Sequence, residues 1–421
     1  MIAPPPPAAA AVQARRDLLA SLLLRRHRQQ VPALAGRIYL NFGALGPLPE
    51  PALAAFQEVY AELGRVGAGS AAGIAAVLLA AERARQALAA ELGAAATAIA
   101  LVESASVGCN VALWGIDWRP GDHLVISDGE YPGVAAAAAA VARRFRLAVT
   151  RWPLAGEDGT VLERLAGCLR PRTRAVVVSH IPWDSGRIVP LAAAAALCRG
   201  RGPAGPLLIV DGAQAAGVLA LDLPALGVDV YACPGHKWWC GPEGTGCLFV
   251  GERAMAELQP VFVGTRGLRF GPGGEILGER TDAGRFEVSS AALPLYAGLA
   301  AALALHGAWD TAAARLERIR RLAGRLWEGL GGLAGRGVER LQAEPPAAGL
   351  VFFRVAGAAA PAAARALEAQ GILLRAVPHT GALRASVHYL NLDEDIDGLL
   401  AAIAAMPAGP SDEGPTACPR C

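Results

Sequence analysis

An aspartate and a lysine stand at the ends of two neighbouring predicted strands, about 26 positions apart. Asp211 ends the apolar run LLIV, and Lys237 follows VDVYACPGH and precedes two tryptophans. In a sheet of parallel strands, the residues that follow the strand ends meet at one edge, where ligands bind. A lysine enclosed by apolar groups loses the hydration of its ammonium and is shifted toward the neutral, nucleophilic amine. Such a lysine can form a Schiff base.

Pyridoxal phosphate is a cofactor that uses such a pair. In its chemistry a lysine forms the imine, and a buried carboxylate keeps the pyridine nitrogen protonated so that the ring accepts electrons from a carbanion. Gln214, three residues after Asp211, can donate to the phenolic oxygen of the ring. A structural Asp–Lys ion pair beneath a sheet fits the same spacing. The pair alone therefore leaves both interpretations open.

The sequence also offers a place for a phosphate and for a ring. ESASVGCN (103–110) leaves a strand and enters a helix near Ser106 and Val107, and backbone N–H groups at a helix start bind phosphate. A serine at this position is equally a plain N-cap. Tyr131, in SDGEYPGV, follows another strand, where its ring can stack on a cofactor or lie half-buried at a turn.

Two arginines, Arg375 and Arg384, stand nine positions apart at the edges of predicted strands in LLRAVPHTGALRASVHY. Guanidinium groups bind carboxylates in bidentate fashion, so one or both can hold the α-carboxylate of an amino-acid substrate against the cofactor. Each of them taken alone is also consistent with a surface arginine.

The elements that must position these residues alternate along the chain from about residue 37. Short β-branched runs are separated by alanine- and leucine-rich helical stretches, which predicts parallel βαβ crossovers with both sheet faces covered. The fold class is therefore α/β, with a mostly parallel sheet. The predicted strands cover residues 98–104, 122–127, 174–180, 206–214, 228–235 and 246–251.

The pattern changes beyond about residue 295 to that of a smaller α+β domain. One helical stripe is followed by predicted strands at 349–355, 372–377 and 384–389 and by a final helix that Asn391 and Glu394 would cap. The stripe consists of Leu316, Ile319, Leu322, Leu326 and Leu330. We predict a leader with a helix (1–36), a large domain (37–295), a small domain (296–407) and a disordered tail (408–421).

Charge and hydropathy exclude several classes of partner. Lys and Arg total 39 against 37 Asp and Glu, a net charge of +2, which argues against nucleic acid or an anionic membrane as the main partner. No run of 18 apolar residues predicts a membrane span. The start, MIAPPPPAAA, lacks the basic segment and cleavage site of a signal peptide.

The eight cysteines have no regular spacing, which fits reduced thiols in a cytoplasmic enzyme. Cys418 and Cys421, in CPRC, form the one close pair. They lie in a Pro/Gly-rich tail with no second pair to complete four zinc ligands, so we predict no metal site. A noncatalytic scaffold that carries sulfur on this pair is an alternative of a different class.

In this order, the residues described above resemble fold-type-I pyridoxal 5′-phosphate enzymes of the class V aminotransferase and cysteine desulfurase group. The resemblance runs from RIYLNFGALGP through NLDEDIDGLLAAI. Several segments are similar, within that group, to the L-cysteine/L-cystine C–S lyases. They are SVGCNVALWGIDWRPGDHLVISDGEYPGV, SHIPWDSGRIVP, GHKWWCGPEGTG, PLYAGL and LRASVHY.

The resemblance implies a role for each matching residue. Lys237 would form the imine, Asp211 would contact the pyridine nitrogen and Gln214 the phenolate. The phosphate would be held by Ser106, Val107 and His236.

The substrate side of the site and the assembly follow from the same resemblance. Arg375 and Arg384 match the two carboxylate-binding arginines of the lyases, and the loop 41–47, with Gly43 and Ala44, would border the substrate. A homodimer is implied, with VGTRG (263–267), which contains Thr265, reaching the phosphate of the neighbouring subunit.

Three positions depart from the family pattern. Tyr131 stands where the stacking aromatic is usually histidine, and it cannot supply an imidazole proton. Pro234 stands where a hydroxyl residue normally donates to the phosphate. Thr265 stands where the lyases have a large aromatic residue, which changes the substrate end of the pocket.

The reaction follows from the position of the thiols. Desulfurases attack the substrate sulfur with a cysteine placed just before the carboxylate-binding arginine, and no cysteine lies between Gly371 and Arg384. We interpret Cys109 and Cys240 as small packed residues. The remaining route is β-elimination on cystine or cysteine, which gives pyruvate, ammonia and a persulfide or sulfide. A class V aminotransferase or epimerase and a cysteine desulfurase are the alternatives.

Overall fold

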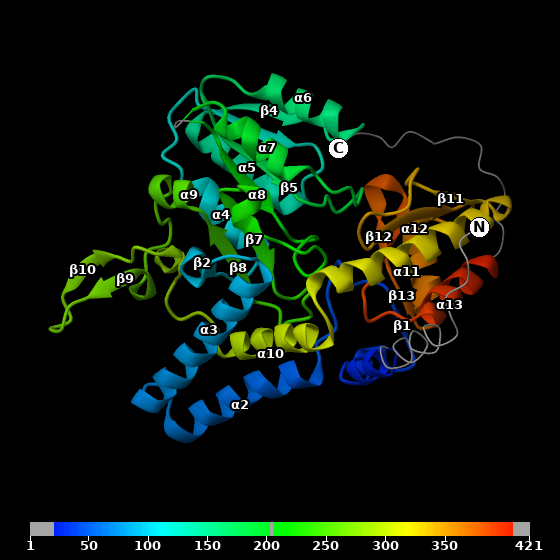
Figure 1. The fold of residues 1–421 in the computed structure, drawn as a ribbon, viewed down its shortest axis with the longest axis horizontal. Helices are drawn as coiled ribbons and strands as arrows, with labels where there is room; N and C mark the ends of the chain where they lie inside the picture. Colours follow the sequence, from blue (N-terminus) through cyan, green and yellow to red (C-terminus); the bar gives the residue numbers. More distant parts are fainter. Residues whose placement is uncertain (1–20, 203–204, 407–421) are drawn as a thin grey trace, which may run out of the picture.

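A seven-stranded sheet, in the order β2-β8-β7-β6-β5-β3-β4, forms the centre of the larger part of the molecule (Figure 1). The computed structural model describes residues 21–202 and 205–406. Five strands, from β7 to β4, run parallel, whereas β8 is antiparallel to both of its neighbours. The strands are β2 (Ile99–Leu101), β3 (His123–Ser127), β4 (Ala148–Trp152), β5 (Thr173–Ser179), β6 (Leu207–Asp211), β7 (Val230–Pro234) and β8 (Gly246–Val250).

The predicted fold class is confirmed, and each of the six predicted strands of this sheet overlaps an observed one. The seventh, β4, was not predicted because it is an edge strand whose residues alternate between half-buried and exposed. Only Trp152 at its end is buried. Its sequence, AVTRW, therefore lacks the continuous apolar run of the central strands.

Helices cover both faces of the sheet and create two cores (Figure 1). Successive residues of one strand enter different cores, as Val176 and Val177 of β5 do, because side chains alternate across a strand. One face is covered by α4 (Ala105–Gly115), α5 (Pro132–Phe145) and α9 (Glu252–Glu257). The other is covered by α3 (Ala71–Glu91), α6 (Asp158–Cys168), α7 (Leu191–Arg199) and α8 (Leu223–Leu226).

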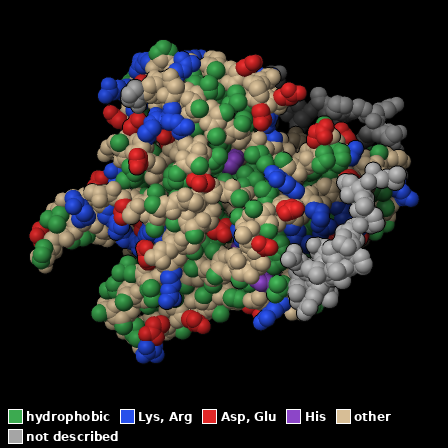
Figure 2. Space-filling model, in the orientation of Figure 1, with side chains coloured by type: hydrophobic (Ala, Val, Ile, Leu, Met, Phe, Trp, Pro, Cys, Tyr) green, Lys and Arg blue, Asp and Glu red, His purple; other side chains and the backbone are tan. Residues whose placement is uncertain are grey.

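Two features extend the larger part beyond the sheet. α2 (Glu50–Val66) and α10 (Pro294–Trp309) pack with α3, so the predicted boundary at residue 295 falls inside α10. The hairpin of β9 (Leu268–Phe270) and β10 (Ile276–Glu279) projects away from the body of the molecule (Figure 1). Figure 2 shows hydrophobic side chains at the end of this projection.

The smaller part is a four-stranded antiparallel sheet in the order β11-β12-β15-β14, covered by helices. Four residues of the predicted stripe are buried on α11; Leu316 is half-buried. The strand β11, only three residues long, was not predicted. The elements are α11 (Ala312–Gly332), β11 (Val338–Arg340), β12 (Leu350–Val355), α12 (Ala360–Glu368), β14 (Arg375–Val377), β15 (Ala382–Ser386) and α13 (Asp393–Ala404).

The start of α13 differs from the prediction. Asn391 and Glu394 were expected to cap this helix, but its N-cap is Leu392, and the Leu392 amide donates to Asp395 Oδ2 at 3.0 Å. Asn391 instead donates from Nδ2 to the carbonyl oxygen of Tyr39 at 2.9 Å. The buried Asp395 carboxylate therefore replaces the predicted cap.

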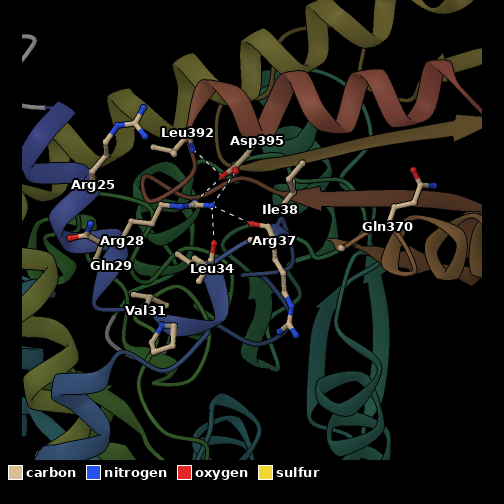
Figure 3. A pocket seen from close by; sticks show the side chains of 14 residues that line it. Arg25, Arg28, Gln29, Val31, Leu34, Arg37, Ile38, Gln370, Leu392 and Asp395 are labelled. Atoms are coloured by element: carbon tan, nitrogen blue, oxygen red, sulfur yellow. Dashed lines mark hydrogen bonds and ion pairs between the residues drawn. The ribbon is translucent and has the colours of Figure 1, made fainter.

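The N-terminal segment packs on the smaller part. Residues 21–29 are helical, and β1 (Ile38–Tyr39) pairs in parallel with β13 (Ile372–Leu373). Arg28 fixes this segment, because its guanidinium forms two hydrogen bonds to the Asp395 carboxylate at 2.8 and 3.1 Å and also donates to backbone carbonyls (Figure 3). The first 20 residues, the 408–421 tail, Cys418 and Cys421 lie outside the described residues. None of the described helices could span a bilayer.

Replacing Arg28 by methionine is expected to lower the free energy of unfolding by about 3 kcal/mol, because the buried Asp395 carboxylate loses its charged partner. Arg25→Met is the matched control. Arg25 pairs with Glu394 at 2.9 Å, but the two side chains are 53% and 67% exposed, so the loss should stay below about 1 kcal/mol. Chemical denaturation followed by tryptophan fluorescence measures both. Equal losses for the two variants would contradict this account of Arg28.

Candidate active site

Lys237 lies in a tight loop that follows β7 at the carboxyl edge of the sheet. The loop is closed by backbone hydrogen bonds from Gly235 to the Thr245 carbonyl (2.7 Å) and from Cys240 to the Lys237 carbonyl (2.9 Å). Cys240 adopts a left-handed conformation, with φ of 54°, which is a strained geometry for a residue with a side chain. The loop therefore holds the backbone of Lys237 in one conformation. Lys237 is also the only lysine in the sequence.

The Lys237 ammonium and the Asp211 carboxylate share a buried environment. Burial lowers the pKa of Lys237 to about 8; the Asp211 carboxylate opposes this shift, and the Arg384 and Arg375 guanidiniums add to it. Burial also raises the pKa of Asp211, an effect that the Lys237 ammonium and a 2.8 Å hydrogen bond from the Ala213 amide oppose. The predicted pair therefore lies together, with its amine shifted toward the nucleophilic form.

Tyr131 lies over the Lys237 amine, in a turn that the neighbouring Glu130 fixes. Lys237 Nζ lies 5.8 Å from the centroid of the Tyr131 ring. The buried carboxylate of Glu130 accepts hydrogen bonds from Ser127 Oγ (2.5 Å) and from the amide (2.6 Å) and hydroxyl (2.9 Å) of Ser179. Burial raises the pKa of Glu130 to about 7, and these donors oppose the shift. Glu130 thus fixes the turn after β3 against β5.

Arg375 and Arg384 lie directly opposite each other on β14 and β15 and line one cavity of about 250 Å³ with Lys237. Arg384 is buried; its Nη1 donates to the Trp183 carbonyl at 3.0 Å, and its Nε has no partner among the described residues. Burial, and secondarily the neighbouring Arg375, lower the pKa of Arg384 to about 10. A carboxylate in this cavity would pair with a guanidinium that has an unused donor.

Gly43, Ala44 and Gln214 also line this cavity. Gln214 Nε2 donates to the Gly43 carbonyl at 2.8 Å, and its Oε1 accepts from Trp238 Nε1 at 3.0 Å. A Cβ on Gly43 would lie 2.7 Å from Gln214 Oε1 and 2.8 Å from Ser386 Oγ, so only glycine fits here. The predicted substrate loop therefore reaches the site.

The residues predicted to hold a phosphate come from two places. His236 lines the cavity, and its buried Nδ1 has no hydrogen-bond partner among the described residues. Ser106 and Val107 lie in the first turn of α4, whose N-cap is Ser104, and the Val107 amide donates to Ser104 Oγ at 3.2 Å. That amide is thus engaged with the cap in this structure, and the phosphate role of all three residues stays a prediction.

Thr265 lies apart from the other predicted residues. It is exposed at the base of the β9–β10 hairpin, where its hydroxyl lies 2.6 Å from Ser289 Oγ. It is not among the residues that line the cavities around Lys237. Its role therefore depends on the expected second subunit.

Three residues of the site escaped the sequence analysis: Glu130, Trp183 and Ser386. Trp183 lines the cavity and meets the Tyr131 ring edge-on at 6.0 Å between centroids. Ser386 is buried, and its Oγ has no partner among the described residues. Two features of the sequence could have indicated two of them. Glu130 directly precedes Tyr131, and Ser386 stands two residues after Arg384, on the same face of a strand.

These residues fit pyridoxal phosphate. A buried amine and a buried carboxylate lie at adjacent strand ends, an aromatic ring lies over the amine, and the unpartnered polar atoms of His236 and Arg384 offer two donor sites for anions. The amine suits the aldehyde of the cofactor, the carboxylate suits its ring nitrogen, and the aromatic ring suits a face of its ring. The two donor sites suit the phosphate and the carboxylate of an amino-acid substrate.

Comparison with protein families gives a match over residues 38–399 to the family described as aminotransferase class V. Among curated proteins, the chain is 34% identical over 243 residues to isopenicillin N epimerase from Amycolatopsis lactamdurans, an alignment that covers 55% of this chain and 58% of the epimerase. It is 25% identical over 399 residues to a probable cysteine desulfurase from Methanothermobacter thermautotrophicus, covering 88% and 94% of the two chains.

Solved structures are similar over most of the chain. The cystine C–S lyase C-DES, in complex with its reaction product cysteine persulfide, is 38% identical with a TM-score of 0.86, covering 90% of this chain and 100% of that one. The cysteine desulfurase CsdA from Escherichia coli is 25% identical with a TM-score of 0.78, covering 90% and 97%. Another C-DES structure contains glycine covalently linked to its pyridoxal-phosphate cofactor.

The single lysine makes the electrostatics of the site directly measurable. In the cofactor-free protein grown on [ε-¹³C]lysine, the one NMR signal should titrate with a midpoint near pH 8 instead of the ordinary 10.5, because burial disfavours the ammonium. Asp211→Asn removes the anion that stabilises the ammonium and should lower the midpoint further. Arg384→Met removes a cation and should raise it.

Arg354→Met is the control for these titrations, because Arg354 is an exposed arginine paired with Glu339 at 2.9 Å. It should leave the midpoint unchanged. A wild-type midpoint above pH 10, or shifts of the opposite sign in the two site variants, would contradict the electrostatic account.

Proposed function

The chain belongs to the aminotransferase class V family of pyridoxal-phosphate enzymes, in the group of cysteine desulfurases and C–S lyases, and from that premise we propose that it cleaves the C–S bond of L-cystine or L-cysteine by β-elimination. The products are pyruvate, ammonia and a persulfide or sulfide. The six described cysteines are all free, and the proposal places the enzyme in a reducing compartment, the cytoplasm.

One observation carries the proposal: the substrate cavity offers a base and a carboxylate site without a thiol. Lys237 and Arg384 line it together, and β14 and β15 are joined by residues 378–381 alone, which leaves no loop for an attacking cysteine. Burial raises the pKa of Cys240, and it raises that of Cys109 well above its ordinary value, so neither thiol is poised as a nucleophile.

Pyridoxal phosphate, when bound, supplies an aldehyde that condenses with amines and a ring that accepts electrons from the carbon next to the amine. Asp211 would keep a proton on the ring nitrogen, and Tyr131 would cover one face of the ring. Arg384 would hold the substrate α-carboxylate with its free Nε. Lys237 Nζ, neutral above about pH 8, would remove the proton from Cα.

The Cβ–S bond then breaks, and the sulfur leaves with the bonding electron pair. Lys237 would retain the proton taken from Cα and could donate it in a later step of the reaction. With one water, cystine gives pyruvate, ammonia and cysteine persulfide, so no oxidant or reductant is needed. A persulfide is more acidic than a plain thiol and leaves more readily at neutral pH, which favours the disulfide substrate.

A second candidate is an epimerase, which the similarity to isopenicillin N epimerase favours. Lys237 would then remove the Cα proton, and a proton would return on the opposite face before any β-group left. Exchange of the Cα hydrogen for deuterium without pyruvate formation would identify this outcome.

We also propose that the enzyme is a homodimer and that its interface includes the projecting hairpin. Phe262 and Ile276 are 57% and 65% exposed, and Leu78 and Leu79 of α3 are also half exposed. Exposed apolar side chains that gather in one patch mark a contact surface, and the proposal takes these residues as part of one. Thr265 lies at the base of this hairpin, in the segment expected to reach the neighbouring site.

Purified protein should release pyruvate from cystine with no keto-acid acceptor present, and Lys237→Ala should abolish this release. Arg384→Lys should raise KM about tenfold to hundredfold with little change in kcat, the equivalent of one charge-assisted hydrogen bond. Coupled pyruvate assays on cystine, cysteine and cysteine sulfinate, with detection of sulfane sulfur, measure both effects.

Arg354→Lys, a change at the exposed ion pair on the outer face of the small sheet, serves as the matched control and should leave KM unchanged. Transamination without pyruvate release, or sulfur transfer that gives alanine, would contradict β-elimination.

Replacing both Ile276 and Leu277 by aspartate should convert a dimer into monomers, because buried charges disfavour an apolar interface. Sedimentation velocity measures the mass. Val149→Asp on β4, where Val149 is also 46% exposed, should leave the dimer intact. A wild-type protein that sediments at the mass of one chain would rule out the dimer.

A further inference from the structure

Two buried histidines contact the backbone that directly follows Lys237. His388 Nε2 lies 3.1 Å from the carbonyl oxygen of Trp238, and His306 Nε2 lies 2.8 Å from that of Trp239. His306 belongs to α10, whereas His388 follows β15 of the smaller part. Both side chains are almost fully buried. The two parts of the molecule thus each place one imidazole behind the lysine loop.

The partners of these rings fix their protonation. A carbonyl oxygen only accepts hydrogen bonds, so Nε2 carries the hydrogen in both rings. The Leu390 amide donates to His388 Nδ1 at 3.3 Å, and the Tyr389 hydroxyl lies 2.7 Å from His306 Nδ1. The His388 imidazole is therefore neutral, because its Nδ1 accepts, and both rings use both nitrogens. Burial lowers the pKa of His306 to about 3 and that of His388 well below its ordinary value, so both rings are neutral near neutral pH.

His388 closes a ring of contacts that includes Trp238, the residue directly after Lys237. Its ring stacks on Phe42, with 4.3 Å between centroids and 14° between planes. Phe42 precedes Gly43, whose carbonyl accepts from Gln214, and Gln214 in turn accepts from the indole of Trp238. The Trp238 carbonyl returns to His388. The substrate loop, Gln214 and the residue after the lysine are thus fixed to one imidazole.

We propose that His388, supported by His306, is a positioning residue for Lys237. Four rotatable bonds separate Lys237 Nζ from its backbone, so the amine is placed only as well as the backbone is held. The Trp238 carbonyl belongs to the peptide that follows the Lys237–Trp238 peptide, and only the φ and ψ angles of Trp238 separate these two rigid planes. Because the Lys237 carbonyl already accepts from the Cys240 amide, holding the Trp238 carbonyl as well fixes the backbone on the C-terminal side of the lysine Cα. The inference rests on the proposed function only in taking Lys237 as the reactive amine.

Two substitutions of His388 separate its two hydrogen bonds. Asparagine places its Oδ1 where Nδ1 accepts from the Leu390 amide, but it cannot reach the Trp238 carbonyl. Glutamine places its Nε2 where the ring donates to that carbonyl. A positioning role predicts that His388→Asn is defective and that His388→Gln restores most of the function, because only the second keeps the bond to the lysine loop.

The first readout needs neither cofactor nor substrate. In the full-length cofactor-free protein labelled with [ε-¹³C]lysine, His388→Asn should broaden the single Lys237 signal and move its titration midpoint up by about one unit, as a looser loop admits water to the amine. In the holoenzyme, His388→Asn should lower kcat about tenfold to hundredfold, the scale of a misplacement of about 1 Å, with KM nearly unchanged.

His123→Asn is the matched control, because His123 is another buried histidine with both ring nitrogens bonded, to Thr173 (2.8 Å) and Thr150 (2.9 Å), at the start of β3 away from the site. It should cost a similar amount of thermal stability while leaving the lysine signal and kcat unchanged. Should His388→Asn fail to fold, His306→Asn, which loses the bond to the Trp239 carbonyl, should shift the same readouts in the same direction.

The proposal is overturned if His388→Asn only loses stability, as the control does, or if glutamine is as defective as asparagine in the lysine titration. Failure of the proposed function looks different. In that case the lysine signal would respond to His388→Asn as expected, while the wild-type holoenzyme released no pyruvate from any of the sulfur substrates.

Discussion

The site depends on one electrostatic constraint, the enclosure of a single amine beside a single carboxylate. Burial pushes the Lys237 pKa down and the Asp211 pKa up, and each group partly offsets the shift of the other. The result is an amine that loses its proton near pH 8 and a carboxylate held against the apolar interior. Both conditions come from the sheet, because β6 and β7 are adjacent and end at the same edge. A change that let water reach the amine would remove the property on which the chemistry rests.

The remaining residues adjust this pair from two directions. The larger part supplies the loop after β7, the turn that carries Glu130 and Tyr131, and His306. The smaller part supplies Arg384, whose buried charge further lowers the lysine pKa, and His388. In the proposed reaction, substrate binding and amine activation are therefore linked, because a carboxylate that neutralised Arg384 would weaken its effect on Lys237. The position of the smaller part is in this sense part of the site.

Much of this site could be predicted from the sequence. The order of strands and helices indicated the α/β class, and the rule that ligands bind at strand ends brought Asp211, Gln214 and Lys237 together. Arg375 and Arg384 were both predicted at strand edges as residues that can bind a carboxylate. The structure places them opposite each other on β14 and β15. These features depend on local pattern and on topology, which the sequence carries directly.

Other residues could not be found in this way because their roles arise from burial and from contacts between distant segments. Glu130 looks like a surface acid of a turn until three donors from β3 and β5 surround it. His388 bonds a residue 150 positions away. The strand β4 was not predicted because an edge strand lacks a strong apolar pattern. The cap of α13 was predicted wrongly because Asp395, instead of Asn391 or Glu394, accepts from the amide at the start of the helix.

The central claim, that Lys237 is the amine that holds the cofactor, is tested most directly by reduction with borohydride followed by mass spectrometry. Because the chain contains one lysine, the account predicts that a phosphopyridoxyl group is found on the peptide that contains Lys237 and on no other, with loss of the visible absorbance. A protein that binds pyridoxal phosphate but carries no such group on Lys237 after reduction would contradict it.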